Sequence, residues 1–243
     1  MIHYHGTPIT PERDASVILM GRHAFVPFLN PDTLGTVVEV CQSFAVDNSA
    51  FTFWRNGKDY DFNGYREFVV SLMNLPMFDW CVIPDVIDGS SAENDRLISE
   101  WTLPKSISVP VWHLHESIER LESLADNFPR VALGSSGQYS SPGTSDWWSR
   151  IGVALKSICN SDGQPRVKLH GMRMLNPEVF RHMPLASADS TNVAQNMGLS
   201  WGGRYEPRVK SAKGVIIADR IEAVQSPQSW RNYEPSFLFG MDA

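Results

Sequence analysis

Short, continuously apolar runs alternate with stretches of helical periodicity along most of this chain, and this alternation constrains the fold more than any other feature. Each run is apolar along its whole length, which is typical of strands that are covered on both faces. Strands of this kind that are separated by helices form parallel sheets. The runs predicted as strands are Ile2–His5, Ser43–Asp47, Trp80–Pro84, Val109–His113, Arg130–Leu133, Val167–His170 and Pro184–Ala188.

The stretches between these runs predict amphipathic helices over Pro31–Val40, Tyr65–Leu75, Ala92–Trp101, Glu116–Ala125 and Ser145–Cys159. Polar or acidic residues follow nearly every predicted strand. In (β/α)8 barrels the active site lies at that edge, whereas an open doubly wound sheet binds its ligand at one switch point. We therefore predict an α/β protein with a single (β/α)8 TIM-like barrel domain over residues 1–243. Gly214–Asp219 is either the eighth strand or a helix.

Composition and cysteine usage exclude several classes of protein. The chain is 42% hydrophobic, which is enough for a sizeable core, but no apolar stretch is long enough to span a membrane. The N-terminus lacks the pattern of a signal peptide. Cys41, Cys81 and Cys159 are far apart and form no CxxC pair, so we expect neither a zinc knuckle nor a disulfide framework. The expected location is the cytoplasm.

The charge is distributed unevenly. The net charge of −6 argues against a protein that simply coats nucleic acid. Residues 164–220, however, contain nine lysines and arginines against four acidic residues, a balance of +5, which leaves −11 for the rest of the chain. This basic C-terminal part fits a local contact with a polyanion, and scattered solvated charges explain it equally well.

Three carboxylates and one small-residue turn end the apolar runs. The apolar run ends at Asp47 in AVDNSAF, at Asp85 in CVIPDVIDG and at Gly134 in VALGSSG. Asp189 lies between small residues in PLASADSTN. A lone aspartate after a strand is more often a turn residue, and Asp88 is an alternative to Asp85. The turn Gly134-Ser135-Ser136-Gly137 would let a planar ligand approach backbone N–H groups.

The histidines leave more than one interpretation open. His113 and His115 would point to the same face if the strand continued, and with Asp85 they could bind a metal. The alternatives are hydrogen bonds to a substrate or, for His115, a place at a helix N-terminus beside Glu116. The carboxylates suit other chemistry, so we expect no metal. His170 and Gly171 close another strand and are candidate substrate contacts, although a packed histidine is the simpler interpretation.

The order of these motifs carries a resemblance to a known family. Asp47-Asn48-Ser49-Ala50-Phe51 resembles the Asp-Ser-Gly-Gly/Ala-Phe motif of tRNA-guanine transglycosylases. Asp85 falls where that family has an aspartate that reads the base, and His113 falls where it has a glutamine. VALGSSG resembles the family's Gly-Gly turn, and Asp189 follows the seventh predicted strand, where the family has its nucleophile. The resemblance covers roughly Ser43 to Asn196.

Two departures narrow the resemblance. The family's Cys-x-Cys-x2-Cys…His zinc site is absent from the sequence, and the chain is shorter than the tRNA enzymes. The zinc subdomain helps those enzymes to dimerise and to bind tRNA, so the resemblance implies neither property for this chain. The chain is most similar to the zinc-less phage-type enzymes that insert 7-deazaguanines into DNA, and YHGTPITP and PVWHLHES also resemble that group.

The resemblance implies a DNA guanine transglycosylase, a pentosyltransferase that exchanges guanine for a 7-deazaguanine such as preQ0 without a cofactor. It implies that Asp189 is the nucleophile, that Asp47 transfers protons and that Asp85 reads guanine. Gly134, Ser135 and Ser136 would contact the other edge of the base, and His113 and His115 the 7-substituent. A guanine in DNA must be flipped out or single-stranded. Residues expected to grip phosphates are Arg173, Arg204, Arg208, Lys210 and Lys213, and Trp201 and Tyr205 are expected either to stack on bases or to pack.

Three alternatives remain. A nucleoside or glycoside hydrolase would use the same two carboxylates with water in place of the incoming base. A metal-dependent barrel hydrolase would use His113, His115 and Asp85. A nucleic-acid-binding module without catalysis would need none of these catalytic or metal-binding residues.

The partners expected for the transglycosylase are DNA, the free 7-deazaguanine base and phage or host helper proteins. No membrane is expected.

Overall fold

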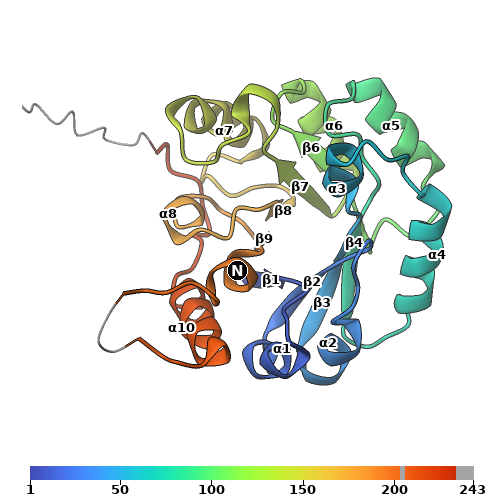
Figure 1. Cartoon of the computed structure of the whole chain (residues 1–243). Coiled ribbons are helices and arrows are strands. Elements are labelled where there is room, and N and C mark those ends of the chain that lie inside the picture. Colours follow the sequence, from blue (N-terminus) through green and yellow to red (C-terminus); the bar gives the residue numbers. More distant parts are fainter. Residues whose placement is uncertain (203–205, 234–243) are drawn as a thin grey trace, which may run out of the picture.

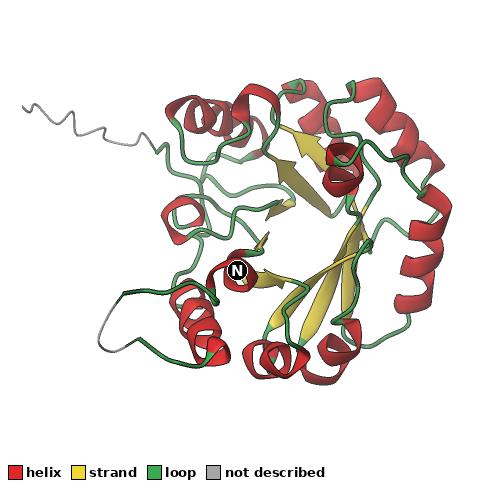
Figure 2. Cartoon of the chain, in the orientation of Figure 1, coloured by secondary structure: helices red, strands yellow, loops and turns green. Residues whose placement is uncertain are grey.

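A parallel sheet forms the centre of the molecule in the computed structural model, which describes residues 1–202 and 206–233. The strand order is β5-β4-β3-β2-β1-β9-β8-β7-β6, and every pairing is parallel. Helices surround the strands on the outside (Figures 1 and 2). The strands are β1 Ile2–Gly6, β2 His23–Pro27, β3 Ser43–Asp47, β4 Phe78–Val82, β5 Ser108–Val109, β6 Val111–His113, β7 Arg130–Gly134, β8 Lys168–Gly171 and β9 Ser187–Ser190.

The two ends of the sheet order meet at Pro110. Strands β5 and β6 are two halves of one extended segment, separated by this proline, which has no N–H to donate. β5 pairs with β4 and β6 pairs with β7, and the N–H of Ala132 donates to the Pro110 carbonyl at 2.9 Å. Because β5 and β6 together occupy one strand position, the nine strands form an eight-stranded barrel. This confirms the predicted (β/α)8-like fold.

The helices have amphipathic sequences, and five of the ten in the described residues begin with a side chain that accepts a hydrogen bond from the first turn. Ser90 and Glu93 form a reciprocal capping box, and the hydroxyls of Ser117 and Thr144 accept from the first turns of their helices. The helices are α1 Glu12–Leu19, α2 Leu34–Val40, α3 Ala50–Arg55, α4 Phe62–Leu72, α5 Ser91–Glu100, α6 Ile118–Asn127, α7 Ser145–Ile158, α8 Pro177–Phe180, α9 Asn192–Asn196 and α10 Lys210–Glu222, with a 3-10 turn η1 over Gly137–Tyr139.

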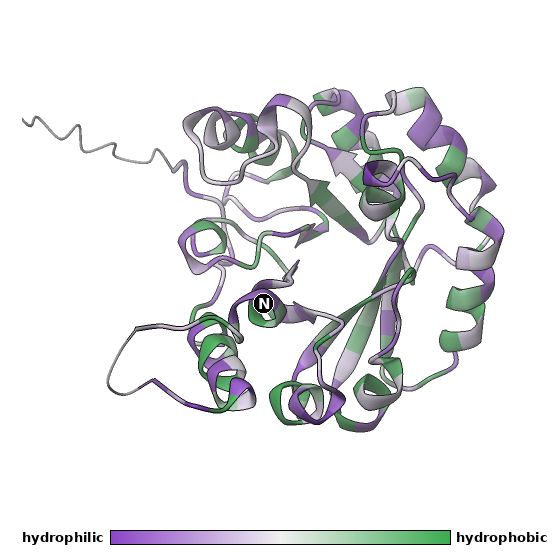
Figure 3. Ribbon diagram, viewed as in Figure 1, coloured by the Kyte–Doolittle hydropathy of each residue, from purple (hydrophilic) through white to green (hydrophobic). Residues whose placement is uncertain are grey.

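Two apolar clusters hold the barrel together, because successive strand residues point to opposite faces. The larger cluster packs between strands and helices. Figure 3 shows hydrophobic and hydrophilic residues alternating along the helices. The smaller cluster contains the side chains that fill the barrel: Tyr4, Phe25, Ala45, Trp80, Val82, Val109, Val111 and Ala132. These interior residues form a packed floor beneath the carboxyl ends of the strands.

The structure identifies the eighth strand of the barrel. It is β2, His23–Pro27, which was not predicted, and Gly214–Asp219 belongs to helix α10, the second of its two stated alternatives. Within α10 the buried Gly214, Ala218 and Ile221 recur at helical spacing, and Gly214 lies against Ile18 of α1. The last strand is also displaced towards the C-terminus relative to the predicted Pro184–Ala188, so Asp189 lies inside β9. None of the helices in the described residues is long and apolar enough to cross a membrane.

Candidate active site

A cavity of about 530 Å³ opens at the carboxyl ends of the strands, and the three predicted carboxylates all line it. Asp47 ends β3, Asp85 follows β4 and Asp189 lies in β9. Parallel strands bring residues that are distant in sequence to one edge in this way. The predicted residues His113, Gly134, Ser135 and Arg173 also line the cavity, together with unpredicted residues that include Thr7, Asn48, Phe51, Arg55, Met172 and Gln195.

The carboxyl group of Asp47 keeps a substantial protonated fraction at neutral pH. Burial, followed by repulsion from Asp189 and Asp85, raises the pKa of Asp47 from 3.8 to about 7. A hydrogen bond from the backbone N–H of Ser49 and the charge of Arg173 oppose this rise. A carboxyl group with a pKa near 7 can both donate and accept a proton at neutral pH, which suits general acid–base chemistry.

The carboxylate of Asp189 is held by two nitrogen atoms on one of its oxygens. Its Oδ1 accepts from the backbone N–H of Arg173 at 2.9 Å and lies 3.2 Å from His170 Nε2. Among the hydrogen bonds and ion pairs between described residues, those of the Asp189 side chain involve Oδ1 and not Oδ2. Asp189 therefore has one oriented oxygen and one oxygen left for a substrate.

The carboxylate of Asp85 is fixed from both sides. Asn48 Nδ2 donates to Oδ1 at 2.6 Å, and His113 Nε2 lies 2.8 Å from Oδ2. Asn48 also donates to the Ile83 carbonyl, and this second bond ties the side chain to the end of β4. Asp85 is thus presented to the cavity in one orientation, as a residue that recognises a ligand requires.

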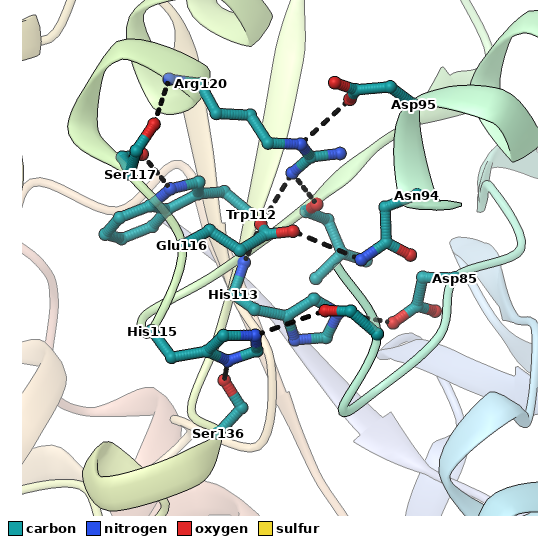
Figure 4. A network of polar contacts seen from close by, with 12 residues as sticks. Asp85, Asn94, Asp95, Trp112, His113, His115, Glu116, Ser117, Arg120 and Ser136 are labelled. Carbon is teal, nitrogen blue, oxygen red and sulfur yellow. Dashed lines mark hydrogen bonds and ion pairs between the residues drawn. The ribbon is translucent and has the colours of Figure 1, made fainter. Parts of the chain in front are cut away.

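A buried polar network supports this part of the cavity from behind (Figure 4). Glu116 Oε2 accepts from the backbone N–H of His113 at 2.8 Å and from Arg120 Nη1 at 2.6 Å. Glu116 Oε1 accepts from Asn94, whose own Oδ1 accepts from the N–H of Val86 beside Asp85. Removing one partner from such a buried network leaves the other charge uncompensated. The network therefore fixes the loops after β4 and β6 relative to each other.

Two backbone positions at the cavity adopt the left-handed conformation that non-glycine residues rarely adopt. In the described part of the chain, Ser49 (φ 61°) and Arg173 (φ 55°) are the non-glycine residues with positive φ. Their N–H groups are the ones directed at Asp47 and Asp189. Strain of this kind concentrates at functional sites.

Several predicted site residues lie outside the cavity wall. His170 is fully buried beneath the cavity and Gly171 packs against Met174 and Leu185. His115 is exposed, with its Nδ1 2.7 Å from Ser136 Oγ, and its ring stacks on His113 at 5.7 Å. His115 and Ser136 are not among the described residues that line the cavity.

The histidines do not adopt a metal-binding arrangement. His113 Nε2 faces Asp85, whereas His115 Nδ1 faces Ser136. No group of three histidine, cysteine or acidic side chains within residues 1–202 and 206–233 is placed to hold a metal ion. The geometry therefore does not favour the metal-dependent alternative that uses His113, His115 and Asp85.

The residues predicted to grip phosphates separate into three groups. Arg173 lines the cavity, where its guanidinium lies 4.4 Å from the centre of the Phe51 ring. Arg208 and Lys210 are exposed. Lys213 is buried, and its ammonium donates to the Leu199 carbonyl and the Glu206 carboxylate, so its role here is to hold the chain before α10. Arg204 and Tyr205 lie outside the described residues.

The cavity also contains an arginine that the sequence reasoning missed. Arg55 lies at the end of α3, one helical turn after Phe51, and its guanidinium is 5.9 Å from that ring. The i, i+4 spacing of Phe51 and Arg55 was the available signal.

Trp201 is exposed and contacts side chains of α10. The centre of its ring lies 5.9 Å from the Lys213 ammonium and 5.5 Å from the Arg220 guanidinium.

Comparisons with protein-family models, curated proteins and solved structures found no significant match to this chain. The resemblance to the transglycosylases consequently rests on the motifs themselves.

Proposed function

We propose that this barrel is a DNA guanine transglycosylase that exchanges a guanine base for a 7-deazaguanine through a covalent glycosyl-enzyme. The observation that carries the proposal is the convergence of three carboxylates with different environments on one cavity. One of them is nearly neutral, one is held on a single oxygen, and one is fixed on both oxygens. Two displacements at an anomeric carbon with recognition of the base need these three roles.

In the first displacement, Asp189 Oδ2 attacks C1′ of the deoxyribose and forms a glycosyl ester. The C1′–N9 bond breaks, and its electron pair leaves with the guanine. Protonated Asp47 gives its proton to the departing base, because its raised pKa keeps a substantial protonated fraction at neutral pH. The free guanine then leaves the cavity.

In the second displacement, the carboxylate of Asp47 takes the N9 proton of the incoming 7-deazaguanine. N9 attacks C1′, the ester bond to Asp189 breaks, and its electron pair returns to the carboxylate. Asp47 is thereby protonated again and Asp189 is free, so the cycle needs no cofactor. Acid and base roles alternate on one residue, as in retaining glycosidases.

Asp85 is proposed to recognise guanine through the donors on its Watson–Crick edge. The carboxylate would accept from N1–H and from the exocyclic amine, a pair of donors that adenine does not present. Each oxygen already has one protein partner and keeps a further acceptor position. Since preQ0 has the same N1–H and amine, one subsite would serve both the departing and the incoming base.

DNA would reach this cavity as a flipped nucleotide or as a single strand. Arg173 and Arg55 both contact the Phe51 ring in the cavity wall. They would pair with the phosphates next to the target nucleotide. Arg208 and Lys210 are exposed and available for further backbone contacts.

Incubation with guanine-containing DNA and preQ0, followed by complete nuclease digestion and mass spectrometry of the nucleosides, tests this proposal. We expect the deazaguanine nucleoside to appear and an equal amount of free guanine to be released. Asp189→Ala should abolish both, whereas Asp88→Asn at an exposed turn should retain both. Abasic sites without incorporation would instead identify a glycoside or nucleoside hydrolase.

A further inference from the structure

His170 is a polar residue inside an apolar barrel. Its ring is fully buried, and its centre lies 4.7 Å from that of Trp80 and 5.5 Å from that of Phe25. Both aromatic residues belong to the cluster that fills the barrel. Burial of an imidazole among such side chains is unfavourable unless both ring nitrogens have hydrogen-bond partners, so the partners of His170 indicate why it is there.

A continuous chain of contacts links His170 to the cavity above and to an arginine below. Arg130 lies at the start of β7, and its Nη1 donates to Ser187 Oγ at 2.8 Å. Ser187 Oγ lies 2.9 Å from His170 Nδ1, and His170 Nε2 lies 3.2 Å from Asp189 Oδ1. The chain runs from the amino end of the barrel to the carboxylate in the cavity.

The carboxylate and the arginine at the two ends of this chain give its hydrogen bonds one consistent direction. As a carboxylate, Asp189 Oδ1 only accepts, so His170 Nε2 carries the proton of a neutral imidazole and Nδ1 is the acceptor of the ring. The hydroxyl proton of Ser187 is then directed at Nδ1. A lone pair of Ser187 Oγ accepts from Arg130, whose guanidinium only donates.

Burial supports the neutral form of the ring. Burial, together with the charge of Arg130, lowers the pKa of His170 below its ordinary value, although the hydrogen bond and charge of Asp189 act in the opposite direction. A neutral donor orients a carboxylate without cancelling its negative charge. The carboxylate consequently keeps its charge for attack on carbon.

We propose that Arg130, Ser187 and His170 form a positioning relay that fixes His170 as the neutral Nε2–H tautomer and holds Asp189 by Oδ1, leaving Oδ2 as the attacking oxygen. This inference rests on the proposed role of Asp189 as nucleophile. In the glycosyl ester, Oδ1 becomes the carbonyl oxygen and still accepts the same hydrogen bond. When the ester breaks, the carboxylate returns to an oriented site.

The tautomer of His170 can be measured without any assay of activity. In a nitrogen-15 histidine spectrum of the full chain at neutral pH, assigned with His170→Gln, we expect an unprotonated signal for Nδ1 and a protonated one for Nε2. A proton on Nδ1, or on both nitrogens, would overturn the relay. Ser187→Ala should release the constraint and change this pattern.

Kinetics of base exchange test the positioning role. Ser187→Ala and His170→Phe should lower kcat by roughly 10- to 100-fold, as for a catalytic group displaced by up to ~1 Å, with KM nearly unchanged. His170→Gln should recover part of the loss, because its amide can donate at a reach similar to that of Nε2–H. The matched control is Ser108→Ala, which removes another buried strand hydroxyl, the acceptor for Trp101 Nε1, and should leave kcat unchanged.

The outcomes separate this relay from the function on which it rests. If the wild type exchanges bases and Ser187→Ala is as active as Ser108→Ala, the relay is wrong and the transglycosylase proposal stands. If His170 shows the expected tautomer but the wild type exchanges no base, the proposed function fails and the hydrogen-bond direction stands.

Discussion

Replacing Asp47 with asparagine tests the electrostatics of the cavity through protein stability. Burial and the repulsion of Asp189 and Asp85 raise the pKa of Asp47 to about 7 in the folded chain. In the unfolded chain the same carboxyl group is solvated and titrates near its ordinary value of about 3.9. Folding therefore takes up a proton at this site between these two values. Asparagine has nearly the same shape as the protonated acid and cannot ionise.

The sign and size of the effect follow from proton linkage. A folded-state pKa above the unfolded value contributes stability that is present below about pH 4 and is lost as the pH rises through about 7. A rise from 3.8 to about 7 corresponds to about 4 kcal/mol. Relative to wild type, Asp47→Asn should thus gain about 4 kcal/mol of unfolding free energy between pH 4 and pH 8, while losing base exchange.

Urea denaturation of both proteins at several pH values between 4 and 8 measures this difference. The contributions of the buried histidines appear in both proteins and cancel in the difference. Asp88→Asn is the matched control, because Asp88 is exposed on the turn that follows Asp85 and should give a difference that does not vary with pH. A difference for Asp47→Asn that stays constant from pH 4 to pH 8 would refute the reasoning.

Three further predictions concern other parts of the site. Asp189→Asn should abolish the covalent DNA adduct while DNA binding, measured by fluorescence anisotropy, is retained; an adduct that persists and maps to another residue would contradict the assignment. Arg120→Met breaks a buried pair with Glu116 and should lower the unfolding free energy by about 3–5 kcal/mol, whereas Arg166→Met at an exposed pair should cost less than about 1 kcal/mol in the same urea titration. Arg173→Gln should weaken single-stranded DNA binding and reduce the slope of log affinity against log salt by about 1, and an unchanged slope would exclude a phosphate contact.

The fold class followed from the sequence because continuously apolar strands between helices leave few arrangements other than a parallel sheet. The eighth strand did not follow. His23–Pro27 has only three apolar residues between a histidine and a proline, whereas the six residues Gly214–Asp219 look more like a strand. A run that short does not separate a two-residue from a 3.6-residue period. The place of Gly214–Asp219 in α10 depends on the packing of Gly214 against Ile18 of α1, which lies almost two hundred residues earlier.

The convergence of Asp47, Asp85 and Asp189 could be predicted because residues that follow parallel strands meet at one edge. The sequence left His170 open between a substrate contact and a packed histidine. A shift of one residue in strand register moves a side chain from the barrel interior to the helix side, and the sequence does not determine register to that accuracy. The structure shows a packed histidine, whose ring lies in the barrel interior with Nε2 3.2 Å from Asp189 Oδ1.

The backbone contributes to this site as directly as the side chains do. Ser49 and Arg173 adopt a conformation that costs roughly 1–2 kcal/mol in a residue with a Cβ. Neither is a residue type enriched there, so nothing in the sequence marks these positions. What the conformation achieves is direction, because it turns the N–H groups towards Asp47 and Asp189. The same kind of donor acts differently on the two carboxyl groups: at Asp47 burial outweighs it and the pKa stays near 7, while at Asp189 a second nitrogen, from His170, shares Oδ1. The proposed division of labour between acid and nucleophile thus depends on what surrounds each carboxyl group besides its backbone donor.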